Sequence, residues 1–478
     1  MNMTFRYKIY SFVLLGWAFA TAGCSRQLNV YPTTQEVDGN IITDEKSAAT
    51  ALNGVYYRFA DAGVDYNNIP IIGWASDFEQ FPSQLSGMLD YAFGGGGLSE
   101  HTYNPKTSYA NIKWIYGSAL VNAANGFLKN IAPLQKITAA DKTRMIAEAK
   151  FLRAAGNSEL LLYYGQYDDT TSPYGIILHD EFIQPDNIYA ARSTVGASYD
   201  AILKDLDEAI PGLPGKNSII AYANTWAAKL LKARVLINRG TPADYAAVIS
   251  LTKDIIANSP FQLEANVKDL FWTKGLTSAE VIMGVQPFTN VAIPKWQGYI
   301  RNAYYGPNAF MTGLFSGDPR AGWYMQTVES SFGPTPAVTK YYPGSPVDIK
   351  ATPITENSYA FRLTEAWLLE AEAIVAGGGG SLTDAKTLLK TVMGHAGFTD
   401  FSTVDAATTA ADLQLLIVEE EMKSFACENG QDWLALRRLP FATVQAMLPT
   451  ITDKHLLLLP IPDAEITSNS KIKQNPKY

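Results

Sequence analysis

The sequence predicts a mostly α-helical fold, and three observations support this prediction. Apolar residues recur every three or four positions along 226–237 and 363–373, which is the spacing of one helix face. Strand-like apolar runs are few and short, such as 281–285 and 456–459. Several predicted helices, including 147–155, place small Ala residues one turn away from large apolar ones, so that helices can pair tightly. We therefore expect degenerate tetratricopeptide-like helix hairpins, interrupted by long loop insertions.

Capping residues and prolines mark where the predicted helices begin and end. Asp44 precedes the first helical pattern, and Asp141 precedes the long pattern 142–164. A further helix, 199–210, ends where Pro211 interrupts the pattern, because proline cannot continue a helix.

The N-terminal segment has the pattern of a lipoprotein signal. Arg6 and Lys8 precede the apolar stretch 9–22, which is shorter than the roughly 20 residues that a membrane-spanning helix needs. Small residues then lead directly into Cys24, as in a lipobox, where the cysteine is lipidated and becomes the first mature residue. An ordinary signal peptide with a chance cysteine and a buried helix are the alternatives.

The lipoprotein signal also predicts how the chain is divided into segments. We expect a signal peptide over residues 1–23, a lipidated tether over 24–45 and one domain over 46–478. The domain divides into a tetratricopeptide-like part, about 46–260, and a C-terminal part, about 261–478.

Composition narrows the class of protein. Hydrophobic residues make up 47% and charged residues 18% of the chain, which is typical of a globular protein. The chain has 46 acidic and 38 basic residues and a net charge of −8, which argues against binding to nucleic-acid phosphates. With Cys24 lipidated, Cys427 is left without a partner for a disulfide.

Sequence signatures of hydrolases and cofactor sites are missing. The chain has no His-Glu-x-x-His zinc motif and no Gly-x-Ser-x-Gly elbow. The glycine runs 94–97 and 377–380 lack the Gly-Lys-Ser/Thr of a phosphate-binding loop. Glu419, Glu420 and Glu421 read as a solvated stretch of helix. No catalytic residue stands out in the sequence, and we expect no cofactor and no metal site.

Aromatic residues in two insertions, about 60–135 and 260–350, are the candidate ligand contacts. Aromatics make up 12% of the chain, and flat rings on loops can stack on sugar rings while carboxylates and amides bind the hydroxyls. The alternative is that each ring packs its own loop onto the scaffold. Tyr304 and Tyr305 also lie in the second insertion. The candidate ligand-binding residues are Trp74, Asp77, Phe78, Phe81, Tyr91, Phe93, Trp296, Tyr299, Trp323 and Tyr324.

Five segments carry a resemblance to a known family. The C-terminal part contains Phe-Ala-Cys-Glu-Asn-Gly-Gln-Asp-Trp-Leu at 425–434 and Leu-Pro-Ile-Pro at 459–462, followed by Asn-Pro at 475–476. Together with the helix motifs within 148–165, 205–214 and 362–373, these are similar to the motifs of the SusD/RagB family, in the same order along the chain.

The resemblance implies a function that composition alone does not. SusD-like proteins are helical surface lipoproteins of the outer membrane. They cover a SusC-like TonB-dependent transporter and deliver oligosaccharides to it, at a ligand site built from the two insertion regions. We therefore expect an oligosaccharide-binding lipoprotein that is not an enzyme, held at the outer membrane by lipid on Cys24 and facing the exterior. The alternatives are a peptide-binding lid of the RagB type, a secreted glycoside hydrolase, and a lid without affinity of its own.

Overall fold

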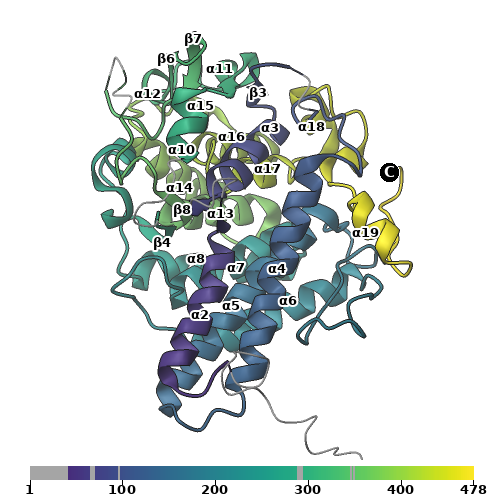
Figure 1. The fold of residues 1–478 in the computed structure, drawn as a ribbon. Helices are drawn as coiled ribbons and strands as arrows, with labels where there is room; N and C mark the ends of the chain where they lie inside the picture. Colours follow the sequence, from purple (N-terminus) through teal and green to yellow (C-terminus); the bar gives the residue numbers. More distant parts are fainter. Residues whose placement is uncertain (1–40, 65–69, 95–96, 288–293, 345–346, 348–349) are drawn as a thin grey trace, which may run out of the picture.

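The computed structural model describes residues 41–478, with the exception of 65–69, 95–96, 288–293, 345–346 and 348–349. The predicted signal peptide and Cys24 therefore lie outside the described residues. The described chain is mostly helical with few short strands, which confirms the predicted fold class (Figure 1). No described helix combines the length and the apolar character needed to cross a bilayer.

The long helices from α2 to α8 form the layer in the lower half of Figure 1, and each packs on the next long helix along the chain. Helix α4 packs on α5, α5 on α6, and α7 on α8, which is the arrangement of stacked helix hairpins. Helix α13 continues the series against α8 and α14. These helices are α2 (Glu45–Phe59), α4 (Ser108–Ile131), α5 (Ala139–Tyr164), α6 (Val195–Ala209), α7 (Thr225–Arg239), α8 (Pro242–Asn258), α13 (Leu363–Ala373), α14 (Leu382–His395) and α16 (Ala410–Ser424).

Local sequence explains where these helices begin and how closely they approach. Asp44 caps α2 through the Ser47 backbone N–H, at 2.8 Å, as expected from the sequence. Helices α4 and α5 cross at Gly117 and Gly156. A Cβ on Gly117 would lie 2.6 Å from Cγ of Leu160, so only glycine permits this approach.

Short helical segments fill the connections between the long helices. They include π-helical and 3₁₀ turns that follow or precede α-helices. They are η1 (Ala75–Gln80), α3 (Phe81–Leu85), η2 (Ile210–Gly212), α9 (Val267–Asp269), η3 (Leu270–Lys274), η4 (Gly275–Thr277), α10 (Pro294–Trp296), η5 (Gln297–Arg301), α11 (Ala309–Leu314), α12 (Ala321–Tyr324), η6 (Ile374–Gly378), α15 (Ser402–Ala406), α17 (Gln431–Leu436), α18 (Phe441–Met447), η7 (Lys454–Leu457) and α19 (Asp463–Ser468).

The strands of the described residues pair as four two-stranded antiparallel sheets. The sheet formed by β3 and β5 joins the first insertion to the second, since Tyr91 lies opposite Tyr305. The β6–β7 hairpin lies near β3 at the top of the molecule (Figure 1). The strands are β1 (Ala62–Val64), β2 (Pro70–Ile72), β3 (Leu89–Tyr91), β4 (Val281–Val285), β5 (Tyr305–Pro307), β6 (Met325–Ser330), β7 (Gly333–Val338) and β8 (Ser358–Arg362).

Four details of the sequence prediction were wrong. Helix α5 begins at Ala139 with Thr138 as its N-cap, so Asp141 lies inside the first turn and is not the cap. The apolar run 456–459 is not a strand, because its first half belongs to the helical turn η7. The first insertion ends before residue 108, where α4 begins. Glu420 and Glu421 are not solvated, because α16 directs them into the interior, where they pair with Arg320 and Arg438.

Candidate functional site

Exposed aromatic rings from both insertions meet on one surface, which we call the aromatic platform. Phe93 is 56% exposed, Tyr304 36% and Phe332 61%, and Tyr91 and Tyr305 are half-buried beside them. Large apolar side chains exposed in contact with one another are unusual on a soluble surface and mark sites of interaction. The aromatic platform consists of Tyr91, Phe93, Tyr304, Tyr305 and Phe332.

The sheet formed by β3 and β5 holds four of these rings. Tyr91 and Tyr305 are cross-strand partners, and their ring centroids lie 5.4 Å apart. Just beyond the strands, the Ala92 backbone N–H donates to the Tyr304 carbonyl at 2.7 Å. Phe93 then lies 5.4 Å from Tyr91 and 6.3 Å from Tyr304, measured between ring centroids. Strand pairing therefore positions rings that are more than two hundred residues apart in sequence.

The turn of the β6–β7 hairpin adds the fifth ring. The Ser331 backbone N–H donates to the Arg301 carbonyl at 2.6 Å, which fixes the turn against η5. Phe332 consequently lies edge-on to Phe93, with ring centroids 5.0 Å apart. Phe81 links the platform to the core. Its ring centroid lies 5.8 Å from that of Tyr305 and 4.9 Å from that of the buried Tyr109.

The platform offers apolar ring faces together with neutral hydroxyl groups. Burial raises the pKa of Tyr305 to about 12, so its phenol stays protonated at neutral pH and can donate a hydrogen bond. The exposed side chains of Arg301 and Glu329 lie on η5 and β6, the elements that carry the hairpin. Flat ring faces beside polar groups suit a ligand with both apolar C–H faces and hydroxyls.

The structure places part of the predicted site in the core instead. Trp74 and Phe78 stack on each other with ring centroids 4.2 Å apart, and each is 3% exposed. Asp77 is buried in η1, and burial together with the Asp61 carboxylate raises its pKa well above the usual range. These three residues lie on a helical turn packed against the scaffold, so they are not available for stacking.

In the second insertion, too, predicted ligand contacts lie in the core. Tyr299, Trp323 and Tyr324 are buried, and the last two pack edge-on with ring centroids 4.5 Å apart. Trp296 is half-buried and packs against the core, while its backbone N–H donates to Glu356 at 3.1 Å. The prediction that these four residues form a ligand surface is therefore not supported by their placement.

A buried ion pair joins the two insertions to each other. Nζ of Lys295 lies 2.9 Å from Oε1 of Glu79, and both side chains are almost fully buried. The Tyr299 hydroxyl donates to the other Glu79 oxygen at 3.2 Å. Lys295 also donates to the Asn357 carbonyl at 2.6 Å, which joins the insertions to β8. Such a pair stabilises the arrangement only because each charge is hydrogen-bonded.

Sequence reasoning missed Phe332, although a signal for it was present. Phe332 stands between Ser331 and Gly333, and a residue next to glycine between two strand-like runs is expected in a turn at the surface. In the described residues, no group of three or more His, Cys, Asp or Glu side chains could hold a metal ion.

Comparisons with known proteins agree with this architecture. Residues 92–237 match the SusD-like_3 family, described as starch-binding associating with outer membrane. The comparison with curated proteins found no match to this chain. A SusD superfamily protein from Bacteroides thetaiotaomicron VPI-5482 superimposes with a TM-score of 0.74 at 20% identity, over 91% of this chain and 100% of that one.

Two further solved structures carry names that describe them more closely. A laminarin-binding SusD-like protein matches with a TM-score of 0.70 at 19% identity, over 91% of this chain and 100% of the other. NanU of B. fragilis matches with a TM-score of 0.72 at 18% identity, over 94% and 100%. Residues 92–237 thus match the SusD-like_3 family model, and the chain shares the fold of SusD superfamily structures along nearly its whole length.

Proposed function

We propose that this protein binds oligosaccharides on the aromatic platform and is not an enzyme. The observation that carries the proposal is the contact between exposed rings of both insertions, since Phe93, Tyr304 and Phe332 form one apolar surface. Aromatic faces bind the C–H faces of sugar rings, and neighbouring polar groups bind the hydroxyls. The description of the matching family as starch-binding and the name of the laminarin-binding structure support a glycan ligand.

The proposal extends to where the protein acts. A lipid on Cys24 would hold it at the outer membrane, facing the exterior, and a SusC-like TonB-dependent transporter would receive the bound oligosaccharide. The family description, which associates its members with the outer membrane, supports this location.

Affinity electrophoresis tests the glycan site. Full-length protein in detergent is run in native gels that contain laminarin, starch or another polysaccharide. We expect one polysaccharide to retard the protein, and Phe332→Ala to weaken binding about fivefold or more, because stacked rings contribute roughly 1 kcal/mol or more each. Tyr189→Ala is the matched control, since Tyr189 is 47% exposed but lies outside the platform.

Two results would contradict the glycan site. One is that no polysaccharide retards the folded protein in any gel. The other is that Tyr189→Ala reduces retardation as much as Phe332→Ala and Phe93→Ala do, because the platform would then have no special part in binding.

Membrane fractionation tests the anchor. We expect Cys24→Ser to prevent incorporation of labelled palmitate and to shift the protein from the outer-membrane fraction to the soluble fraction, since stable attachment depends on the acyl chains. Cys427→Ser, at a buried position, is the control and should leave fractionation unchanged. Unchanged labelling of the Cys24→Ser protein would refute a lipid on this residue.

A further inference from the structure

Two acidic side chains, Asp61 and Asp77, are hydrogen-bonded to each other through their carboxyl groups. Asp61 follows α2, and Asp77 lies in η1, where it is only 6% exposed. A Cβ on Gly73 would overlap Oδ2 of Asp61, so the chain needs glycine at this position to admit the carboxyl group. Two carboxyl groups in hydrogen-bond contact cannot both be ionised when they are shielded from water, so one of them must hold a proton.

The proton of this pair belongs to Asp77. Burial and the neighbouring Asp61 carboxylate raise the pKa of Asp77 well above its usual range. Burial also raises the pKa of Asp61, but the hydrogen bond from Asp77 acts in the opposite direction. The protonated Asp77 therefore donates to Asp61, while its Oδ1 accepts from the Ser76 hydroxyl at 2.7 Å.

The charges that face this pair do not remove the need for the proton. Lys113 of α4 lowers the pKa of both carboxyl groups, but its Nζ already pairs with Oε2 of Glu159 on α5, at 2.7 Å. Arg58 of α2 lines a small pocket together with the first carboxyl group and is exposed, so that solvent screens its charge. Burial raises the pKa of Tyr109 and Tyr116 on α4 well above the usual range, so these neighbours stay neutral.

The turn η1 connects this pair to one side of the aromatic platform. Phe81 directly follows η1, and its backbone N–H donates to the Ser76 carbonyl. The Tyr109 hydroxyl donates to the Asp77 carbonyl at 3.1 Å, and the Tyr109 ring packs against Phe81. The position of Asp77 therefore determines the position of Phe81, whose ring contacts the platform residue Tyr305.

The same turn is also connected to the other side of the platform. Glu79 of η1 pairs with Lys295, which lies in α10 directly before η5. The last residue of η5, Arg301, accepts through its carbonyl from the Ser331 N–H and so holds the turn that bears Phe332. A π-helical turn such as η1 is rare, and such turns frequently occur at functional sites.

We propose that Asp77 is a positioning residue for the aromatic platform, and that the platform binds a glycan only while Asp77 holds its proton. Loss of the proton would leave two anions in hydrogen-bond contact, and their repulsion would displace η1 together with Phe81. Glycan binding should therefore weaken as the pH rises through the pKa of Asp77. This inference rests on the proposed glycan site, but the position of η1 can be measured without a glycan.

Affinity gels that contain laminarin or starch, run as a series from about pH 5 to about pH 10, test the role of the proton. We expect retardation of the full-length wild-type protein to weaken about fivefold or more at high pH, as for the loss of one platform ring. Asp77→Asn should bind as wild type does at low pH and should not share this fall, because its amide donates to Asp61 and accepts from Ser76. Ionisation of the platform tyrosines is common to both proteins, so the difference between them isolates Asp77.

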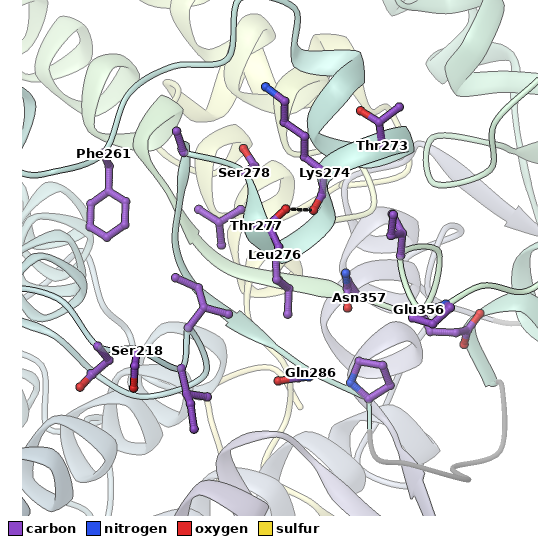
Figure 2. A pocket seen from close by; sticks show the side chains of 18 of the residues that line it. Ser218, Phe261, Thr273, Lys274, Leu276, Thr277, Ser278, Gln286, Glu356 and Asn357 are labelled. Carbon is purple, nitrogen blue, oxygen red and sulfur yellow. Dashed lines mark hydrogen bonds between the residues drawn. The ribbon is translucent and has the colours of Figure 1, made fainter.

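Glu356→Gln is the control for a proton elsewhere in the protein. Glu356 lines a separate cavity of about 1160 Å³ (Figure 2), and no residue of η1 or of the platform is among the described residues that line it. This variant should keep the fall of retardation with pH. The proposal would be overturned by a profile that is the same in wild type and Asp77→Asn, or by one that becomes flat in Glu356→Gln.

Hydrogen exchange at about pH 7, without glycan, separates failure of this inference from failure of the glycan site. We expect Asp77→Leu to speed exchange within 75–93 and 325–338, because η1 and the β6–β7 hairpin lose their anchor, whereas Asp77→Asn should exchange as wild type does. Unchanged exchange in 325–338, or exchange that rises equally throughout the chain, would refute a positioning role. If no gel retards the wild-type protein, the glycan site fails, and the exchange experiment still decides whether Asp77 positions the platform.

Discussion

Solvent exposure of single residues separates the aromatic side chains of the insertions into two groups. Trp74 and Tyr299 are buried, so their rings contribute packing, whereas Phe93 and Phe332 expose more than half of their surface. A buried ring stabilises the fold through the apolar area that it removes from water. An exposed ring contributes little stability, and this difference makes the platform the part of the insertions that is free to bind a ligand.

Glu356 is a residue whose charge state should influence stability near neutral pH. Burial raises its pKa from 4.5 to about 7, although the positive charge of Lys295 and backbone hydrogen bonds act in the opposite direction. The folded protein therefore holds a proton that the unfolded chain releases above about pH 4.5. The free energy of unfolding should fall as the pH rises through this range, and it should level off above about pH 7.

The variant Glu356→Gln should abolish this part of the pH dependence. At about pH 8 we expect it to be more stable than wild type by up to about 3 kcal/mol, because the neutral amide avoids the cost of a buried charge. Urea unfolding at about pH 5 and about pH 8 measures the effect. Glu329→Gln, at an exposed position, is the control. An identical pH profile in Glu356→Gln and wild type would refute the assignment.

Among the secondary-structure elements, the β6–β7 hairpin is the one on which the platform depends most directly. Its turn is held by the Ser330 hydroxyl, which donates to the Gly333 carbonyl and accepts from the Phe332 N–H, both at 3.0 Å. Gly333 has a φ of +93°, which other residues adopt only at a cost. The turn geometry, and with it the position of Phe332, therefore requires glycine.

Replacing this glycine should affect binding more than folding. We expect Gly333→Ala to strain the turn by about 1–2 kcal/mol and to weaken retardation in the glycan gel, because Phe332 moves away from Phe93. Gly322→Ala is the matched control, since a Cβ at that position of α12 meets no atom within 4 Å and its φ is ordinary. Retardation that is equally strong in both variants would show that the hairpin does not hold part of the site.

At the scale of the whole molecule, buried charges connect parts of the chain that are far apart. Arg362 at the start of α13 pairs with Glu280 and Glu428, and Lys340 binds Glu428 at 2.6 Å. All four side chains are fully buried. Such a network joins the second insertion, β8 and the C-terminal segment into one body, and its strength depends on every charge having a partner.

Removing the cation at the centre of this network, Arg362, should therefore strongly destabilise the fold. We expect Arg362→Met to lower the free energy of unfolding by about 3–5 kcal/mol, because it leaves Glu280 buried without its cation and Glu428 with one partner fewer. Lys390→Met removes the cation of the more exposed pair with Asp405 and should cost less than about 1 kcal/mol. Chemical unfolding of both variants measures the difference, and equal losses would contradict a structural role of the network.

Much of the fold was determined by the sequence alone. Helical periodicity predicted the long helices, and Asp44 marked the start of α2, because caps and periodicity depend only on neighbours along the chain. Short elements were less predictable. The run 456–459 has the composition of a strand, but packing made its first half a helical turn, since a short apolar run suits either conformation.

The candidate site was decided by the tertiary structure. Sequence placed aromatic residues in two insertions, and both insertions contribute to the platform, yet it could not distinguish the exposed Phe93 from the buried Trp74. Exposure depends on which surfaces meet, and here strand pairing of Tyr91 with Tyr305 and the buried contact of Lys295 with Glu79 determine it. These contacts join residues more than two hundred positions apart, a separation at which local patterns carry no information about contact.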